Sequence, residues 1–274
     1  MAKTDPWNAT DSQDDAVLDV MIDRLEMRGT YPPFVGMLND YLDAMRIDEA
    51  GTVLDLGCGT GIASRAIARR SGFAGELTGI DLSEYLVRAA RTLAEREGVS
   101  GRCTFLAGDS HALDLPDAGF DAVVAHTLFS HLTDPAQVLA EALRLVRPGG
   151  PIAVFAGDYA SLTFALDDPA ASGPADARFI AAVVAQPRVM RRMPRLARAA
   201  GLEIEAVLPG VITETGTGDF WLSGVQAFRK LGPSSGVATA AEADAWVGAL
   251  EDASARGVFF GSSNYYAYIL RRPR

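Results

Sequence analysis

The sequence predicts an α/β fold in which helices cover both faces of a mostly parallel sheet. Short apolar runs that suit buried strands alternate with amphipathic runs that suit helices. A glycine-rich turn joins the first of these strands to the helix after it. Strands that alternate with helices pair in parallel through right-handed crossovers. The 274 residues suffice for one large domain, and we expect a single domain over residues 1–274.

Two helices are predicted ahead of the first strand, and residues 1–50 are expected to form an N-terminal helical cap. The first helix covers residues 14–28, starts at Asp14 or Asp15 and ends at Gly29. The second runs from about residue 33 to residue 45. The apolar side chains of the first helix recur at helical spacing: Val17, Leu18, Met21, Ile22 and Leu25.

The core of the fold is expected over residues 51–157, with five strands. These are residues 53–56, 77–81, 103–107, 120–125 and 152–156. A helix at about 62–71 follows the first strand. Ser83 caps the next helix, which Gly98 ends, and Asp134 with Pro135 starts the helix before the fifth strand.

The remaining segments elaborate this core. Residues 158–200 interrupt the alternation, and we expect them to fold as a lid over the ligand-binding edge of the sheet. Residues 201–274 are expected to complete the sheet, with a helix at about 239–255 and a final strand around 264–270.

The turn Asp55–Gly61 (DLGCGTG) is the most informative site. Glycines allow a sharp turn and let a ligand approach where a Cβ would collide. Asp81 ends the next strand, where its carboxylate can accept both hydroxyls of a ribose. The dinucleotide pattern Gly-x-Gly-x-x-Gly/Ala does not fit, because Ile62 or Ser64 occupies its last position. The site therefore predicts a nucleotide-like ligand other than NAD.

Five ordered segments resemble the motifs of class I S-adenosylmethionine (SAM)-dependent methyltransferases. They are residues 53–61, 79–83, 107–110, 120–124 and 143–150. The chain looks most like the ubiquinone/menaquinone-type small-molecule methyltransferases. This resemblance implies a Rossmann-like three-layer αβα sandwich with a seven-stranded sheet, mostly parallel, whose last strand is antiparallel.

The resemblance also implies the cofactor-binding residues, which surround SAM from its methionine end to its adenine. Gly57, Gly59 and Gly61 would face the methionine, Asp81 the ribose, and Asp109 and Ser110 the adenine. The other expected cofactor-binding residues are Asp55, Cys58, Leu82 and His126. Simpler roles stay open: Asp81 could cap a helix, Asp109 could shape a turn, and Cys58 could fill space in the loop.

Four side chains near the expected ligand-binding edge are candidates for catalysis. His126 ends the fourth strand, where it could act as a base, pack against its neighbours or contact SAM. His131 could instead tie down the turn before Asp134. Asp158 and Tyr159, placed just after the fifth strand, could orient an acceptor. His111 is expected to contribute little beyond its backbone.

The resemblance implies methyl transfer from SAM to an oxygen or carbon atom of a small-molecule acceptor, with S-adenosylhomocysteine (SAH) as product and no metal. Residues 125–128 lack the Asn/Asp-Pro-Pro-aromatic motif of enzymes that methylate planar amino groups. Three alternatives stay open: a non-methylating cyclisation or rearrangement, a non-enzymatic SAM-binding protein, and a nicotinamide-dependent reductase.

Segment 178–198 concentrates arginines and has two interpretations. The arginines are Arg178, Arg188, Arg191, Arg192, Arg195 and Arg198, with Met190 and Met193 among them. They could form the solvated face of a helix, or a lid that meets an anionic substrate.

Net charge and cysteine content limit the partners. A net charge of −10 disfavours nucleic acid and anionic membranes. No run approaches the length of a membrane helix, and residues 1–15 do not resemble a secretory signal. Two cysteines make no disulfide framework. We expect a soluble cytoplasmic protein with a small-molecule acceptor, and a homodimer is left open.

Overall fold

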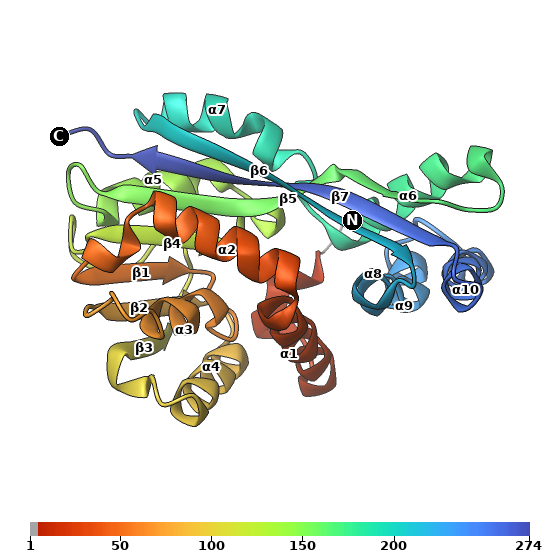
Figure 1. Cartoon of the computed structure of the whole chain (residues 1–274), viewed down its shortest axis with the longest axis horizontal. Coiled ribbons are helices and arrows are strands. Elements are labelled where there is room, and N and C mark those ends of the chain that lie inside the picture. The colour runs from red at the N-terminus through yellow and green to blue at the C-terminus, as the bar shows by residue number, and fades with distance from the viewer. Residues whose placement is uncertain (1–4) are drawn as a thin grey trace.

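One mixed sheet organises residues 5–274, the part of the chain that the computed structural model describes (Figure 1). Its seven strands are β1 (Thr52–Leu56), β2 (Glu76–Asp81), β3 (Cys103–Ala107), β4 (Ala122–His126), β5 (Pro151–Phe164), β6 (Glu203–Gly216) and β7 (Phe259–Arg271). Their order is β3-β2-β1-β4-β5-β7-β6, and β7 alone pairs antiparallel with its two neighbours. The predicted fold is confirmed.

Helices cover both faces of the sheet because successive strand residues point to opposite sides. Val53 and Val124 pack with α2 (Pro32–Ala44) and α3 (Ile62–Ala68). Their chain neighbours Leu54 and Val123 pack with α5 (Pro135–Leu145) and α7 (Val189–Ala199) on the other face. All four of these strand side chains are fully buried. The fourth strand begins two residues later than predicted.

The predicted helix starts are confirmed by their capping bonds. Asp14 accepts a hydrogen bond from Val17 N at α1 (Asp15–Thr30), and Ser83 accepts one from Leu86 N at α4 (Glu84–Arg96). Asp134 caps α5, and Thr239 forms a reciprocal capping box with Glu242 at α10 (Ala240–Ala255). The helix α1 continues one residue past Gly29.

The fifth strand is longer than predicted. β5 continues to Phe164 because β7 pairs with it beyond the apolar run, through Gly157↔Tyr265 and Asp158↔Asn264 and, after a register shift, Thr163↔Ser262. Asp158 and Tyr159 therefore lie within β5 and not after it, which corrects their predicted placement.

The Arg-rich helix α7 covers the sheet and is not part of a lid. Its Met190 and Met193 are buried in the core under α5, whereas its four arginines are exposed. The other two arginines of the segment, Arg188 at the N-cap of α7 and Arg178 in α6, are exposed as well. An amphipathic helix that buries its apolar stripe leaves its charged face to solvent. The interpretation as a solvated helix face is therefore confirmed, and the Met residues meet the core and not a substrate.

The rest of the expected lid packs at the far end of the long strands (Figure 1). Helix α6 (Pro169–Val183) contacts β5 and α9 (Phe228–Ser234), and α9 contacts α10. Aromatic side chains join them: the Trp246 ring centroid lies 5.6 Å from that of Phe164 and 5.2 Å from that of Phe179. Helix α8 (Asp219–Val225) leads from this group back to α1.

The N-terminal cap is helical, as predicted, over its described residues. It comprises the 3₁₀ helix η1 (Pro6–Ser12), α1, α2 and the short 3₁₀ helix η2 (Ile47–Glu49). Residues 1–4 of this predicted cap lie outside the described residues. Among residues 5–274, no helix combines the length and the hydropathy that crossing a membrane requires.

Candidate cofactor cleft and active site

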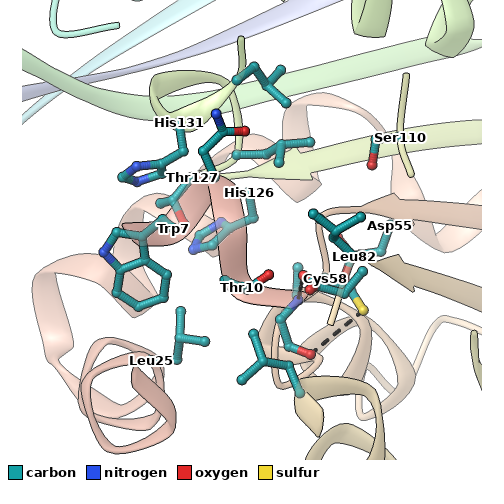
Figure 2. A pocket seen from close by; sticks show the side chains of 18 of the residues that line it. Trp7, Thr10, Leu25, Asp55, Cys58, Leu82, Ser110, His126, Thr127 and His131 are labelled. Carbon is teal, nitrogen blue, oxygen red and sulfur yellow. Dashed lines mark hydrogen bonds between the residues drawn. The ribbon is translucent and has the colours of Figure 1, made fainter. Parts of the chain in front are cut away.

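A cleft opens at the carboxyl ends of β1, β2 and β4, with η1 and α1 across it (Figure 2). Figure 2 shows Trp7 and His131 on one side of this cleft, Asp55, Cys58 and Leu82 on the other, and His126 between them. Parallel sheets bind ligands at this edge. Most of the predicted cofactor-binding residues line the cleft, including Gly57, Gly59, Asp109 and Ser110; Gly61 lies in the same turn.

The three glycines of the turn take backbone conformations that other residues avoid. Gly57, Gly59 and Gly61 have φ values of +64°, +55° and +78°. A Cβ on Gly57 would lie 2.5 Å from Leu128 Cδ1, and one on Gly61 would lie 2.7 Å from the Phe105 ring. Both the backbone and the neighbouring side chains therefore require glycine in this loop.

Asp55 presents an unused acceptor in the floor of the cleft. Its Oδ2 accepts hydrogen bonds from Ser64 N (3.2 Å) and Ser64 Oγ (2.7 Å). Its Oδ1 is buried and has no hydrogen-bond partner among residues 5–274. Burial raises the pKa of this carboxyl to about 7. A cationic ligand would satisfy Oδ1 and stabilise the ionised form.

Asp81 is held in place by two backbone amides at the end of β2. Its Oδ2 accepts Gly59 N at 2.8 Å and its Oδ1 accepts Ser83 N at 3.0 Å. Burial raises the pKa of the carboxyl, and both hydrogen bonds oppose that rise. Because an ionised carboxylate has about four acceptor sites, both oxygens keep a site for a ribose hydroxyl.

The turn after β3 joins Asp109 to His111. Asp109 Oδ1 accepts His111 N at 2.9 Å and lies 2.6 Å from His111 Nδ1. The His111 ring thus does more than predicted. Asp109 shapes the turn and its side chain is more than half exposed, while the neighbouring Ser110 is buried against the cleft.

Cys58 fills space in the loop. Its thiol is buried, and burial together with the charges of Asp55 and Asp81 holds its pKa well above the ordinary value. A thiol that stays protonated is a poor nucleophile. This favours the filler role over a nucleophile.

His126 ends β4, and its ring is enclosed by aromatic residues. Its Nδ1 lies 3.0 Å from the Tyr41 hydroxyl, and its ring stacks on Phe155 with centroids 4.9 Å apart. Burial, assisted by the charge of Arg28, lowers the pKa of His126 to about 3. The imidazole is therefore neutral at physiological pH.

Tyr41 determines which nitrogen of His126 carries the proton. Tyr41 is fully buried, and burial raises its pKa well above the ordinary value, so the hydroxyl keeps its hydrogen. Among residues 5–274 its one hydrogen bond is to His126 Nδ1. Because an unpaired buried hydroxyl is costly, Tyr41 donates to Nδ1 and the imidazole proton lies on Nε2. His126 therefore offers the cleft a donor.

The residue after His126 is strained. Thr127 has φ +62°, a left-handed conformation that β-branched residues rarely adopt. Its amide donates to Phe155 O at 2.7 Å, and it lines the cleft. Strain of this kind concentrates at functional sites. Nothing in the sequence pattern indicated it.

His131 anchors the N-terminal segment. Its Nδ1 lies 2.8 Å from Asp5 Oδ2, which also accepts Ala185 N at 2.9 Å. The Trp7 ring packs 5.8 Å from the His131 ring. Trp7 and Thr10 line the cleft, so this anchor holds η1 across the opening. The sequence offered His131 a structural role in the turn before Asp134, whereas its ring contacts Asp5 of the N-terminal segment.

Asp158 and Tyr159 leave the strand in opposite directions. Asp158 is 2% exposed and binds Arg191 of α7, with Oδ2 2.7 Å from Nη2. Tyr159 lies edge-on to His131, with ring centroids 6.3 Å apart. Asp158 is therefore occupied by its ion pair with α7. Tyr159 stays a candidate for orienting an acceptor beside the cleft.

Comparison with known proteins finds a family match in the central part of the chain. Residues 53–150 match the family described as a methyltransferase domain. The chain is 31% identical over 230 residues to an uncharacterized 37.1 kDa protein in transposon TN4556 of Streptomyces fradiae, covering 83% of this chain and 64% of that protein.

Two characterised relatives match the central part of the chain. Identity is 36% over 111 residues with a sterol 24-C-methyltransferase of Aspergillus fumigatus (40% of this chain, 29% of the relative). Identity is 37% over 131 residues with the ubiquinone biosynthesis O-methyltransferase of Aeromonas salmonicida, covering 46% of this chain and 53% of that protein. The chain spans less than two thirds of the length of each of these three relatives.

Solved structures share the fold. A putative methyltransferase from Bacillus halodurans superposes with a TM-score of 0.60 at 17% identity, covering 86% of this chain and all of that one. The [4+2]-cyclase SpnF superposes with a TM-score of 0.57 at 22% identity, covering 88% and 81%.

The fold is the Rossmann-like fold of class I methyltransferase structures. Residues 53–150 form a methyltransferase domain, and the resemblance predicted from the motifs is confirmed over this part of the chain.

Proposed function

We propose that this chain is an enzyme that binds SAM in the cleft and transfers its methyl group to an oxygen or carbon atom of a small-molecule acceptor. The observation that carries this proposal is the fit of the cleft to SAM. A glycine loop with no room for a Cβ lies beside Asp55 Oδ1, a buried acceptor without a partner among residues 5–274. The α-ammonium group of SAM is a donor of the right charge for that oxygen.

The residues along the cleft suit the other parts of SAM. Asp81 would accept the ribose hydroxyls, and Ser110 would meet the adenine. Bound SAM supplies an electrophilic methyl group on its sulfonium, so the chain needs no nucleophile of its own. Among residues 5–274, no group of three or more His, Cys, Asp or Glu side chains could hold a metal ion.

At the acceptor end, the chain positions groups and excludes water. His126, neutral and with its proton on Nε2, would orient an acceptor by donating a hydrogen bond. Trp7 and Thr10 of η1 would cover the ligands. Orientation and desolvation of this kind supply much of the rate in bimolecular transfers. Two relatives of the chain, a sterol 24-C-methyltransferase and a ubiquinone biosynthesis O-methyltransferase, support carbon and oxygen as acceptor atoms.

Isothermal titration calorimetry tests the cofactor. We expect the chain to bind SAM and SAH and to bind NADH negligibly. Asp81→Asn should weaken SAH binding more than tenfold, because a hydrogen bond to a charged group is worth about 1.5–3 kcal/mol. Asp114→Asn, on an exposed residue, is the control. Tight NADH binding with no response to SAM or SAH would overturn the proposal.

Product analysis tests the reaction. With labelled SAM and a panel of phenolic, quinone-like and polyketide-like acceptors, we expect label in an acceptor and one equivalent of SAH. The neighbour SpnF is a [4+2]-cyclase of this fold, which keeps a non-methylating reaction as the second candidate. Consumption of an acceptor without stoichiometric SAH would favour that candidate.

A further inference from the structure

Helix α1 brings a guanidinium group into the cleft. Arg28 lines the cleft one turn beyond Leu25, and its guanidinium carbon lies 5.9 Å from the ring centroids of both Trp7 and Phe34. Its Nε is buried and has no hydrogen-bond partner among residues 5–274. Buried donors are normally paired. A ligand in the cleft could supply the acceptor that Arg28 Nε lacks.

A second cation lies one turn earlier on the same helix. Arg24 Nη1 donates to Phe220 O at 2.6 Å and to Ser223 Oγ, and burial with the charge of Arg28 lowers the pKa of Arg24 to about 10. Among residues 5–274, neither arginine forms an ion pair with a carboxylate. The nearby carboxylate of Glu214 accepts Phe220 N and Trp221 N instead.

Two adjacent cations without an anion are unfavourable in a partly desolvated site. Burying a charge without a partner costs several kcal/mol, roughly, even after relaxation. The chain holds 35 acidic residues, and many of its other arginines are paired with one. The missing counter-ion at Arg28 therefore indicates a ligand that brings negative charge into the cleft.

We propose that Arg28 binds a carboxylate of a ligand in the cleft. The planar guanidinium suits a carboxylate because it offers paired N–H donors in a fixed geometry. This inference rests on the proposed function, and the carboxylate has two sources there: the methionine end of SAM, or an acidic acceptor bound beside His126.

Binding of two nucleosides tests the first source. SAH carries the methionine carboxylate, whereas 5′-methylthioadenosine has the same nucleoside without the amino-acid end. If Arg28 holds the cofactor, Arg28→Gln should weaken SAH binding more than tenfold and change methylthioadenosine binding less than twofold. Arg28→Lys keeps the positive charge but not the paired N–H donors of the guanidinium, so its SAH affinity should lie between those of wild type and Arg28→Gln. Arg88→Gln, on an exposed arginine of α4, is the matched control.

Binding of small acids tests the second source. Protein saturated with SAH is titrated with hydroxybenzoic acids and with their uncharged primary amides. If Arg28 holds the acceptor, wild type should prefer the acids, Arg28→Gln should lose that preference at least tenfold, and SAH affinity should stay unchanged.

The outcomes separate this inference from the proposed function. If Arg28→Gln weakens SAH binding or loses the preference for acids over amides, a carboxylate site at Arg28 is supported. If it does neither, the inference is overturned. Wild type that binds neither SAH nor methylthioadenosine overturns the cofactor proposal, and the acid titration, repeated without SAH, then tests Arg28 alone. Without ligand, Arg28→Gln should unfold at or above the wild-type temperature, because it removes a charge beside Arg24. A marked decrease would assign Arg28 a structural role and overturn the inference.

Discussion

The imidazole of His126 is buried between Tyr41 and Phe155, and this burial limits its chemistry. A general base is most effective when its pKa lies near the working pH. The pKa of about 3 makes His126 a poor proton acceptor, and the hydrogen bond from Tyr41 leaves the proton on Nε2. We therefore expect no acidic limb from His126 in the pH–rate profile.

The same burial makes His126 a source of acid sensitivity. Its folded pKa of about 3 lies below its unfolded value of 6.5, so the unfolded chain binds more protons between these values. Stability linked to His126 is complete above pH 6.5 and is lost as pH falls toward 3. Below pH 6.5, His126→Gln should lose about 1 kcal/mol less per pH unit than wild type in urea unfolding.

The difference in unfolding free energy between wild type and His126→Gln, followed against pH, isolates the contribution of His126. The raised pKa of Asp55 also makes stability depend on pH, but Asp55 titrates in both proteins and cancels in the difference. Parallel pH–stability curves for wild type and His126→Gln would contradict the assignment.

The motifs predicted one wall of the cleft, because their residues follow strands directly. Asp55, Asp81 and Ser110 line one cleft, as their places after strands predicted, and their contacts with SAM stay a prediction. Tyr41 and Arg28 were missed, because they reach His126 from helices far away in sequence and their side chains would suit any helix. Only the packing of α1 and α2 on the sheet brings them there.

The strand–turn–helix of β1 and α3 depends on Gly61. An alanine in a left-handed conformation costs about 1–2 kcal/mol. In Gly61→Ala the new Cβ would also clash with the Phe105 ring at 2.7 Å, which adds about 1–3 kcal/mol. We expect a lower free energy of unfolding by urea and loss of SAH binding by calorimetry.

Gly98→Ala is the matched control. Gly98 has a similar φ of +71°, and within residues 5–274 no atom lies within 4 Å of the position of its Cβ, apart from its chain neighbours. It should lose only the backbone contribution and keep SAH binding. Equal destabilisation of the two variants would mean that Phe105 moves aside without cost.

Strand and helix lengths were predictable where local sequence decides them. The capping residues Ser83 and Asp134 marked helix starts correctly. The extent of β5 was not predictable, since its second half is a strand only because β7 pairs with it. The place of α7 was not predictable either, because Met193 packs in the core under α5 through a contact between segments far apart in sequence.

Across the whole molecule, the N-terminal segment is tied to the far side of the cleft. Asp5 accepts hydrogen bonds from Trp7 N and Ala185 N and pairs with His131. Asp5→Ala should free η1. We expect SAH to associate and dissociate several-fold faster in stopped-flow measurements, with a smaller change in Kd.

Asp11→Ala serves as the control for this experiment. Asp11 lies in the same segment and is exposed. It should leave both rates unchanged. Exchange rates unaffected by Asp5→Ala would show that SAH reaches the cleft without displacement of η1.

The strand β6 ends the sheet with an open edge of 14 residues, along which Val207 and Val211 are exposed. Such an edge can recruit strands from other chains and seed fibres. Pro209, midway between the two valines, has no amide hydrogen to donate to an added strand, and Glu203 is exposed near the start of β6. The neighbouring Glu205 pairs with Arg271 of β7. A strand added at this edge would therefore lose a ladder hydrogen bond at Pro209, midway along β6. This disfavours edge-to-edge pairing of two copies, and the homodimer stays a prediction.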